Sequence, residues 1–201
     1  MSPDSGTAAP RRMTSEARRA QLAEAAIAIV AADGYTGLTL DAVAERAGVT
    51  RNLLYHYFPD GRSDLFTAAV ELAGSTLTEG WLTDSDVPIE ERLAANFARF
   101  FDHALEPSDV WLVHRQGRLL NEPEIAALGE RYRSVVVEAV ALNHFGTEHP
   151  GPFAESALRA FLDFAEKALD ECRERDLDRD RLYRLLADTL LAVVASVKAT
   201  V

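Results

Sequence analysis

Residues 38–58, LTLDAVAERAGVTRNLLYHYF, constrain the fold of this chain more than any other segment. They predict a helix, a three-residue turn centred on Gly48 and a short second helix, because glycine supplies the permissive backbone that a sharp helix–helix corner needs. The second helix is rich in polar and aromatic side chains: Arg51, Asn52, Tyr55, His56 and Tyr57. Packing in a core explains such a helix poorly. A surface that fits into a groove of DNA explains it well.

The residue types on this second helix match the chemistry of DNA. In a helix-turn-helix the N-terminal end of the second helix reaches deepest toward the base edges. Arg51 suits the O6 and N7 acceptors of guanine and Asn52 suits the N6 and N7 atoms of adenine, although either side chain also binds phosphate. The free amides at the helix that Thr39 begins form a site for a phosphate. Arg62, the next cation after the motif, is expected to clamp the same strand.

Several of these residues can have roles that do not involve DNA, and the sequence leaves these alternatives open. Thr39 and Thr50 are both placed to cap helices, which needs no DNA. Arg51 has acidic neighbours with which it can pair. Tyr57 is equally suited to the core and to the surface, and Phe58 is expected to be a core aromatic.

Three pieces of the segment 18–69, namely GYTGLT, AVAERAGVT and LYHYF, resemble the TetR family of transcriptional regulators. The resemblance implies an all-α homodimer with a three-helix DNA-binding head and a C-terminal ligand domain, whose last two helices form a four-helix dimer bundle. Carried over by position, the DNA contacts are Thr39, Thr50, Arg51, Asn52, Tyr55, His56 and Tyr57. The chain departs from the family pattern after Pro59, where Asp60-Gly61-Arg62 replaces a short polar stretch with lysine.

The net charge of −11 is unfavourable for a nucleic-acid-binding protein until its distribution is considered. Residues 1–70 contain seven arginines and eight acidic residues, whereas residues 71–201 contain 14 basic and 24 acidic residues. The acidity therefore belongs to the C-terminal part, which can be held away from phosphates. A single cysteine, Cys172, provides neither an intramolecular disulfide nor a metal cluster, so no metal and no cofactor are expected. We find no membrane-spanning stretch and expect a cytoplasmic protein.

Helical periodicity runs through nearly the whole chain, and no alternating strand pattern is convincing. The expected helices cover residues 15–33, 40–46, a short segment capped by Thr50, 64–80 capped by Ser63, 89–105, 108–120, 124–145, 153–175 and 180–200. Gly34 is placed to end the first helix with a left-handed residue, and Pro107 is among the expected breaks. We predict a flexible tail at 1–14, a helix-turn-helix domain at 15–62 and a helical ligand-binding and dimerisation domain at 63–201.

The last two helices carry apolar stripes that are wide for the surface of a 22 kDa protein. We predict that they pair with a second copy of the chain through Leu158, Leu162, Leu169, Leu186, Leu190, Val193 and Val197. Burial of these residues inside a single chain is the competing interpretation.

A ligand pocket is expected among the middle helices, because apolar walls with a few directed polar groups are typical of small-molecule sites. The predicted ligand-binding residues are Phe97, Phe101, Trp111, His114, Arg115, Tyr132 and Phe161. His103, Gln116 and Asn121 are further polar residues considered for this pocket. Ordinary core packing is the alternative for the aromatic residues.

Together these features predict a ligand-responsive repressor that binds a short palindromic operator as a homodimer and is released by a small-molecule effector. An enzyme is disfavoured, because the sequence shows no nucleophile elbow, phosphate-cradling glycine loop or metal-ligand pair. A helical partner-binding protein that has lost its affinity for DNA is disfavoured by the intact cluster of Arg51, Asn52 and the rings that follow.

Overall fold

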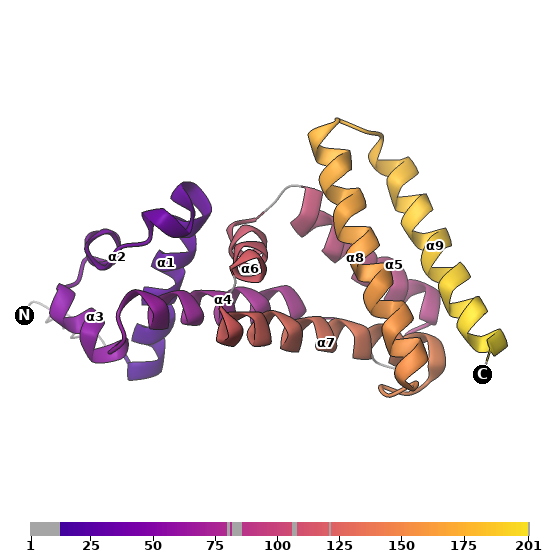
Figure 1. Cartoon of the computed structure of the whole chain (residues 1–201), viewed down its shortest axis with the longest axis horizontal. Helices are drawn as coiled ribbons and strands as arrows, with labels where there is room; N and C mark the ends of the chain where they lie inside the picture. The colour runs from indigo at the N-terminus through magenta and orange to yellow at the C-terminus, as the bar shows by residue number, and fades with distance from the viewer. Residues whose placement is uncertain (1–12, 80, 82–85, 106–107, 121, 201) are drawn as a thin grey trace, which may run out of the picture.

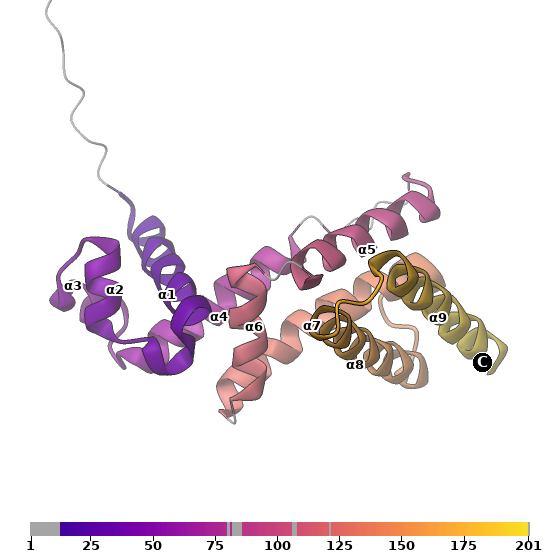
Figure 2. The same cartoon turned by 90° about the horizontal axis from the view of Figure 1, so that it is seen from above.

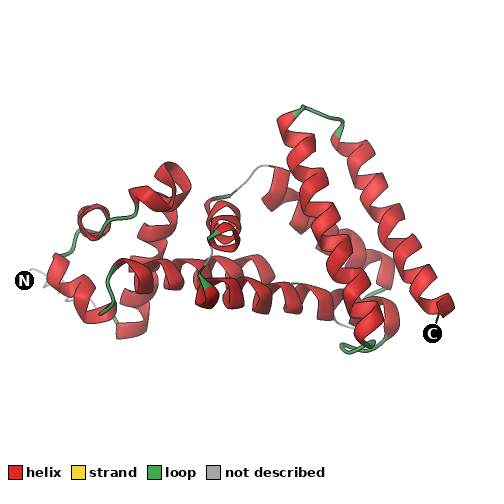
Figure 3. Cartoon of the chain, in the orientation of Figure 1, coloured by secondary structure: helices red, strands yellow, loops and turns green. Residues whose placement is uncertain are grey.

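The computed structural model describes residues 13–79, 81, 86–105, 108–120 and 122–200, and every regular element in these ranges is a helix (Figures 1 and 3). The predicted all-α class is confirmed. Among these residues no helix is long and apolar enough to cross a membrane. Residues 1–12 of the expected tail at 1–14, the break at Pro107 and the polar residue Asn121 lie outside the described residues.

The head consists of α1 (Ser15–Gly37), α2 (Leu40–Ala47) and α3 (Arg51–Tyr57), which lie together at one end of the molecule (Figure 1). The side chain of Thr14 caps α1 by accepting a hydrogen bond from the N–H of Ala17 at 3.2 Å. Gly34 has a φ of 71° and interrupts the helix, but its ψ of 178° is not that of the left-handed helix end expected from the sequence. One more helical turn nevertheless follows this kink before α1 ends.

The corner between α2 and α3 forms as the sequence predicts. Thr39 caps α2 by accepting from the N–H of Ala42 at 3.1 Å. Gly48 takes the left-handed conformation, with φ 65° and ψ 38°, and its N–H is directed to the last carbonyls of α2. Leu54 and Phe58 are fully buried and anchor α3 to the head. The expected core position of Phe58 is thus confirmed.

Two expected caps are wrong. Thr50 precedes α3 but its side chain makes no capping hydrogen bond. The next helix, α4 (Arg62–Thr78), begins earlier than expected, so Ser63 lies inside its first turn instead of capping it. Gly61, with a φ of 70°, occupies the N-cap position and allows the chain to turn tightly from α3 into α4.

The remaining helices extend from the head in one elongated body (Figures 1 and 2). α4 leaves the head and packs along α7 (Pro123–Phe145), while α6 (Asp109–Leu119) packs against α1, α4 and α7. At the far end, α8 (Pro152–Glu174) and α9 (Arg179–Thr200) form an antiparallel pair, and α5 (Ile89–Leu105) packs against α8. The helix that continues from the head is therefore also a wall of the body.

Two hydrophobic clusters hold these helices together. The first joins the head to the middle of the body, because Leu22, Val43 and Phe58 share it with Val70 of α4 and Val113 of α6. The second fills the space between α5, α7, α8 and α9. The core of the head continues through α4 into the body, and the boundary at residue 62 stays a prediction.

Most of the residues that the sequence assigned to a dimer interface lie instead in the interior of the single chain. Six of the seven are buried within the single chain, namely Leu158, Leu162, Leu169, Leu186, Leu190 and Val197. Only Val193 is partly exposed. The competing interpretation is correct for these six, because α8 and α9 turn their most apolar stripes toward each other and toward α5 and α7.

Candidate DNA-binding surface and effector cavity

The outer face of α3 presents most of the side chains that the sequence singles out for DNA. Arg51, Asn52, Tyr55 and His56 are exposed, whereas Tyr57 is half-buried against the core of the head. The rings of His56 and Tyr57 meet edge to face with centroids 5.0 Å apart. Since buried Leu54 fixes the inner side of the helix, the exposed side chains are held on a rigid element and face solvent.

Arg51 forms an exposed ion pair in the DNA-free protein. Its Nη1 atom donates to both carboxylate oxygens of Asp41, at 3.1 and 3.2 Å, and its guanidinium lies 5.8 Å from the ring centroid of Tyr55. The hydrogen bond to Tyr55 and the charge of Asp41 raise the pKa of Arg51, so it stays charged. Exposed ion pairs contribute little to stability, and a phosphate or a guanine can compete for this guanidinium.

Arg62 has an intramolecular role that the sequence does not reveal. Its Nη2 atom donates to the carbonyl oxygen of Tyr35 at 2.6 Å, and its guanidinium lies 3.9 Å from the ring centroid of Tyr35. The side chain thus fastens the start of α4 to the kinked end of α1. This replaces the expectation that Arg62 clamps a phosphate, because its charge is directed into the protein.

A cavity of about 60 Å³ lies among α4, α5, α6, α7 and α8. α6 supplies Trp111, His114, Arg115 and Arg118, which share one helical face because their spacing follows the helical repeat. The wall also includes Trp81, Phe100, His103, Tyr132, Arg133, Leu162 and Glu166. Four of the seven predicted ligand-binding residues line this cavity: Trp111, His114, Arg115 and Tyr132.

Tyr132 reaches this cavity because α7 approaches α4 at a glycine. A Cβ atom added to Gly74 would lie 2.2 Å from Cδ2 of the Tyr132 ring, far inside van der Waals contact. The absence of a side chain at Gly74 therefore provides the space that the ring occupies on the cavity wall.

A second cavity of about 30 Å³ adjoins the first and shares Trp81, Phe100 and Leu162 with it. The predicted residues Phe97 and Phe161 line this second cavity, whose other members are mostly apolar. Phe101 lines neither of them. It is buried, with its ring centroid 5.3 Å from that of Tyr183 on α9.

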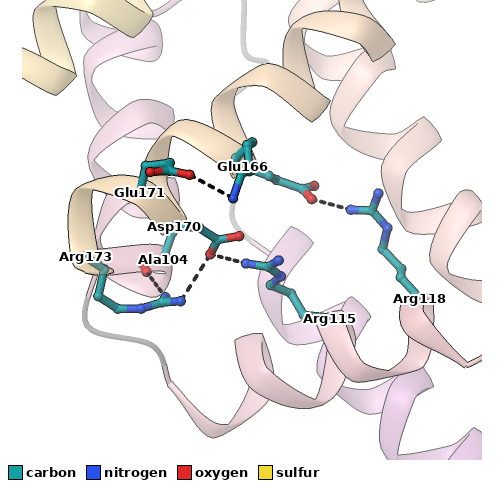
Figure 4. A network of polar contacts seen from close by, with 8 residues as sticks. Ala104, Arg115, Arg118, Glu166, Asp170, Glu171 and Arg173 are labelled. Atoms are coloured by element: carbon teal, nitrogen blue, oxygen red, sulfur yellow. Dashed lines mark hydrogen bonds and ion pairs between the residues drawn. The ribbon is translucent and has the colours of Figure 1, made fainter. Parts of the chain in front are cut away.

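Ion pairs link α6 to α8 beside the first cavity (Figure 4), and Arg115, Arg118 and Glu166 of these pairs line it. Arg115 pairs with Asp170, Arg118 pairs with Glu166, and Asp170 also accepts from Arg173 at 3.1 Å. Arg133 on α7 pairs with Asp163 at 2.5 Å. With a further contact between Arg118 and Asp163 at 3.5 Å, the pairs form two clusters beside the cavity. Arg115 and Arg173 share Asp170, and Arg118 and Arg133 share Asp163, with Glu166 on Arg118.

Two buried nitrogen atoms on the same wall have no hydrogen-bond partner within the described chain. They are Nε1 of Trp111 and Nδ1 of His114. Burial, together with the positive charges of Arg118 and Arg133, lowers the pKa of His114 to about 4. His114 is therefore neutral at pH 7, and the local potential is positive.

Gln116 lies on a different face of α6 and contacts the head. Its Oε1 atom accepts a hydrogen bond from the backbone N–H of Tyr35 at 3.0 Å. The kink at Gly34 interrupts the helical hydrogen bonds of α1 and makes this N–H available. α6 therefore lines the cavity with one face and holds the head with another.

Comparison with known proteins relates the head to one family of regulators. The family described as "Bacterial regulatory proteins, tetR family" matches residues 22–69, which span the corner between α2 and α3. The HTH-type transcriptional activator FasR of Mycolicibacterium smegmatis is 28% identical over 131 residues, which cover 62% of this chain and 58% of FasR. A TetR-family transcriptional regulator from Streptomyces coelicolor superposes with a TM-score of 0.74 at 27% identity, over 92% of this chain and 84% of that one.

The head is a TetR-family DNA-binding segment. A TetR-like regulator from Rhodococcus sp. RHA1 shares the fold of the whole chain at 19% identity, with a TM-score of 0.68 over 92% of this chain and 99% of that one. The proteins that it matches regulate transcription and are not enzymes. The TetR-family head binds DNA, which agrees with the exposed polar face of α3.

Several residues of the cavity were not predicted from the sequence. Arg118 was detectable, since it follows Trp111, His114 and Arg115 at helical spacing. Arg133 and Glu166 gave no such signal, because their approach to α6 depends on how α7 and α8 pack. Gln116 was considered for the pocket, but it lies against the head instead.

Proposed function

We propose that this regulator is a homodimeric repressor that binds a palindromic operator and releases it when a small molecule occupies the cavity beside α6. The observation that carries the proposal is the double role of α6, which contacts the cavity through Trp111 and Arg115 and the head through Gln116. A ligand that displaces α6 must strain or break the hydrogen bond to Tyr35, and thereby alters the position of the head.

The DNA contacts in this proposal come from α3 and from the helix starts around it. They are Thr39, Thr50, Arg51, Asn52, Tyr55, His56 and Tyr57, and Arg62 is left out because it is bound to Tyr35. Exposure of the polar face of α3 supports base and phosphate contacts in a major groove. The ion pair between Asp41 and Arg51 must break when a phosphate or a guanine binds Arg51.

The dimer in this proposal forms through the outer faces of α8 and α9. Four large apolar side chains are exposed there, with Phe153 61%, Phe164 42%, Leu185 51% and Leu191 53% accessible to solvent. Large exposed apolar side chains concentrated on two adjacent helices are typical of a protein–protein interface. A two-fold dimer places two recognition helices on successive major grooves, roughly 34–36 Å apart, and a shift of a few ångströms removes that match.

Repression follows if the operator overlaps a promoter, because a bound dimer then blocks access to it. FasR is named as a transcriptional activator. A reporter assay therefore tests whether this protein represses or activates transcription. We expect a reporter driven by the chain's own upstream region to be switched off by the protein. Since operator DNA lies in the bacterial cytoplasm, the proposal places the protein there.

DNase footprinting on that upstream region tests the DNA contacts. We expect the wild-type chain to protect a short palindrome, and the R51A/Y55A double variant to lose this protection. Lys167→Ala is the matched control, because Lys167 is an exposed cation on α8, far from α3. Protection that is unchanged in the double variant contradicts the contact assignment, provided that thermal unfolding shows both variants to be folded.

A further inference from the structure

The two adjoining cavities differ in chemistry. The first has polar and cationic groups from α6, α7 and α8 on its wall, whereas the second is lined mainly by leucine, valine, alanine and phenylalanine side chains. Trp81, Phe100 and Leu162 belong to both. A ligand that fills the pair must therefore be polar at one end and apolar at the other.

The unsatisfied group on the polar wall is a hydrogen-bond donor. An indole N–H can only donate, and Nε1 of Trp111 is buried without a partner in the described chain. A buried donor without a partner is costly, so a ligand with an acceptor at this position removes the penalty. His114 is neutral and can donate or accept beside it.

The charges on the wall favour an anion. In the two ion-pair clusters described above, Arg118 and Arg133 are balanced by Asp163 and Glu166, whereas Arg115 and Arg173 share the single carboxylate of Asp170, which leaves one positive charge in excess. Among the described residues that line the first cavity, Glu166 is the only carboxylate and it already accepts from Arg118. The carboxylate of Glu166 thus occupies the position at Arg118 where a ligand carboxylate can bind.

We propose that the effector is an amphipathic carboxylate, whose charged group binds beside Trp111, Arg115 and Arg118 and whose apolar part enters the second cavity. This inference rests on the proposed effector role of the cavity. A carboxylate accepts two parallel hydrogen bonds from one guanidinium, which suits these arginines better than a neutral acceptor does. The acidic body of the chain, with ten more acidic than basic residues after residue 70, disfavours a ligand with several negative charges.

Binding requires the wall to move. The first cavity, at about 60 Å³, has room for only a few water-sized groups. The incoming carboxylate takes the place of Glu166 at Arg118, and the link between α6 and α8 opens. Exchange of one carboxylate for another keeps Arg118 paired while it frees α6 to move.

Tryptophan fluorescence gives a direct test that needs no DNA. The chain has two tryptophans, Trp81 and Trp111, and both line the first cavity. The titrants are dodecanoate, dodecyltrimethylammonium and dodecanol, which share a chain length and differ in charge, each kept below its micelle-forming concentration. We expect saturable quenching by dodecanoate, with affinity at least tenfold higher than for the other two. Equal affinities, or a preference for the cation, overturn the proposal.

Four variants locate the carboxylate. Arg115→Gln leaves Asp170 paired with Arg173, so it creates no unpaired carboxylate, and it should weaken dodecanoate binding at least tenfold without affecting dodecanol. Trp111→Phe keeps a ring and removes the donor, and it should weaken dodecanoate severalfold, with Trp81 as the reporter. Glu166→Gln removes the competing carboxylate and should strengthen dodecanoate binding. Arg159→Gln, which breaks an ion pair with Glu130 outside the cavity, is the control and should change nothing.

The result for Glu166→Gln separates this proposal from a purely structural role of the ion-pair clusters. Damage to the fold weakens all three titrants, whereas loss of a competing carboxylate strengthens only the anion. Dodecanoate affinity that is unchanged in both Arg115→Gln and Trp111→Phe overturns the inference. Thermal unfolding of each variant verifies that it is folded at the temperature of the titration.

Release of the operator distinguishes this inference from the proposed function. If dodecanoate binds as described but does not release operator DNA, the carboxylate site stands and the effector role fails. If dodecanol or dodecyltrimethylammonium releases the operator while dodecanoate does not bind, the effector role stands and the carboxylate assignment fails.

Discussion

Gln116 on α6 accepts a hydrogen bond from the backbone N–H of Tyr35, 81 positions earlier in the chain, at an N···O distance of 3.0 Å. The carbonyl oxygen of the same residue accepts from Arg62 at the start of α4. The backbone N–H and the backbone carbonyl of Tyr35 are thus bound by side chains of α6 and α4. This arrangement ties the kinked end of α1 to the two helices through which a change in the cavity can reach the head.

Replacing Gln116 by alanine should loosen the end of α1. Loss of the acceptor leaves the N–H of Tyr35 without its partner, which costs about 1 kcal/mol and corresponds to roughly fivefold faster amide hydrogen exchange. Gln116→Glu keeps an acceptor at the same position and serves as the control. Exchange at Tyr35 that is equally slow in wild type and Gln116→Ala would show that this hydrogen bond does not hold the head.

Replacing Arg62 by methionine should reduce stability and leave the electrostatics of DNA binding intact. The variant keeps most of the apolar stem but loses the hydrogen bond and the ring contact to Tyr35, so we expect the free energy of unfolding to fall by about 1–3 kcal/mol. The slope of log K for DNA binding against log salt concentration should stay as in wild type. Arg51→Met, in contrast, should reduce that slope by about 1 if Arg51 meets a phosphate.

We therefore expect Arg62→Met to lower the stability measured in a urea titration and Arg51→Met to lower the slope measured in a salt titration. An Arg62→Met variant with full stability and a reduced salt slope would restore the phosphate clamp that the sequence suggests.

Replacing Leu186 by alanine should act on the core of the single chain. Leu186 is fully buried among α5, α8 and α9 neighbours, and removal of a buried leucine side chain costs about 2–5 kcal/mol. Urea unfolding measures this loss, and sedimentation equilibrium should show that association is unchanged under native conditions. A variant that dissociates without losing stability would return Leu186 to the dimer interface.

Introducing aspartate at Leu185 and Leu191 should separate the dimer without unfolding the chain. Both side chains are about half exposed on α9, so a charge there remains hydrated in the monomer but is desolvated at an apolar interface. We expect monomers in sedimentation equilibrium and an unchanged helical circular dichroism spectrum. Leu119→Asp is the matched control, because Leu119 is 80% exposed at the end of α6. Dimers that persist in the double variant would exclude this face of α9.

His114 should make stability depend on pH in the acid range. Burial and two nearby arginines lower its pKa in the folded chain to about 4, below the value near 6.5 of an unfolded chain. Between these values the unfolded state binds more protons, so stability is complete above about pH 6.5 and falls as the pH decreases toward 4. This group alone accounts for up to about 3 kcal/mol, since each pKa unit corresponds to 1.36 kcal/mol.

Urea unfolding at pH 7 and pH 4.5 measures this dependence, and His114→Gln should flatten it. His103 and His144 also have pKa values lowered mainly by burial, so part of the slope should remain in that variant. An identical slope in wild type and His114→Gln would contradict the assignment to His114.

Local sequence patterns were enough to predict the helices and the head of this protein. Helical periodicity and capping residues are local properties, so most predicted helices agree with the structure to within a few residues. The glycine at position 48 and the cap at Thr39 are set by backbone sterics and by a hydrogen bond over three residues, and both were predictable. The polar face of α3 was readable for the same reason, and the DNA contacts assigned to it stay a prediction.

The packing partner of each helix, in contrast, depends on contacts between residues that are distant in the sequence. An apolar stripe reveals which face of a helix is buried, but not whether its partner is the same chain or a second copy, and so Leu158 and Leu186 were assigned to the wrong contact. The same limit applies to Arg62, Gln116, Arg133 and Glu166, whose roles depend on groups at least 27 positions away in sequence. Local patterns specify the helices, whereas the cavity and its link to the head arise from long-range packing.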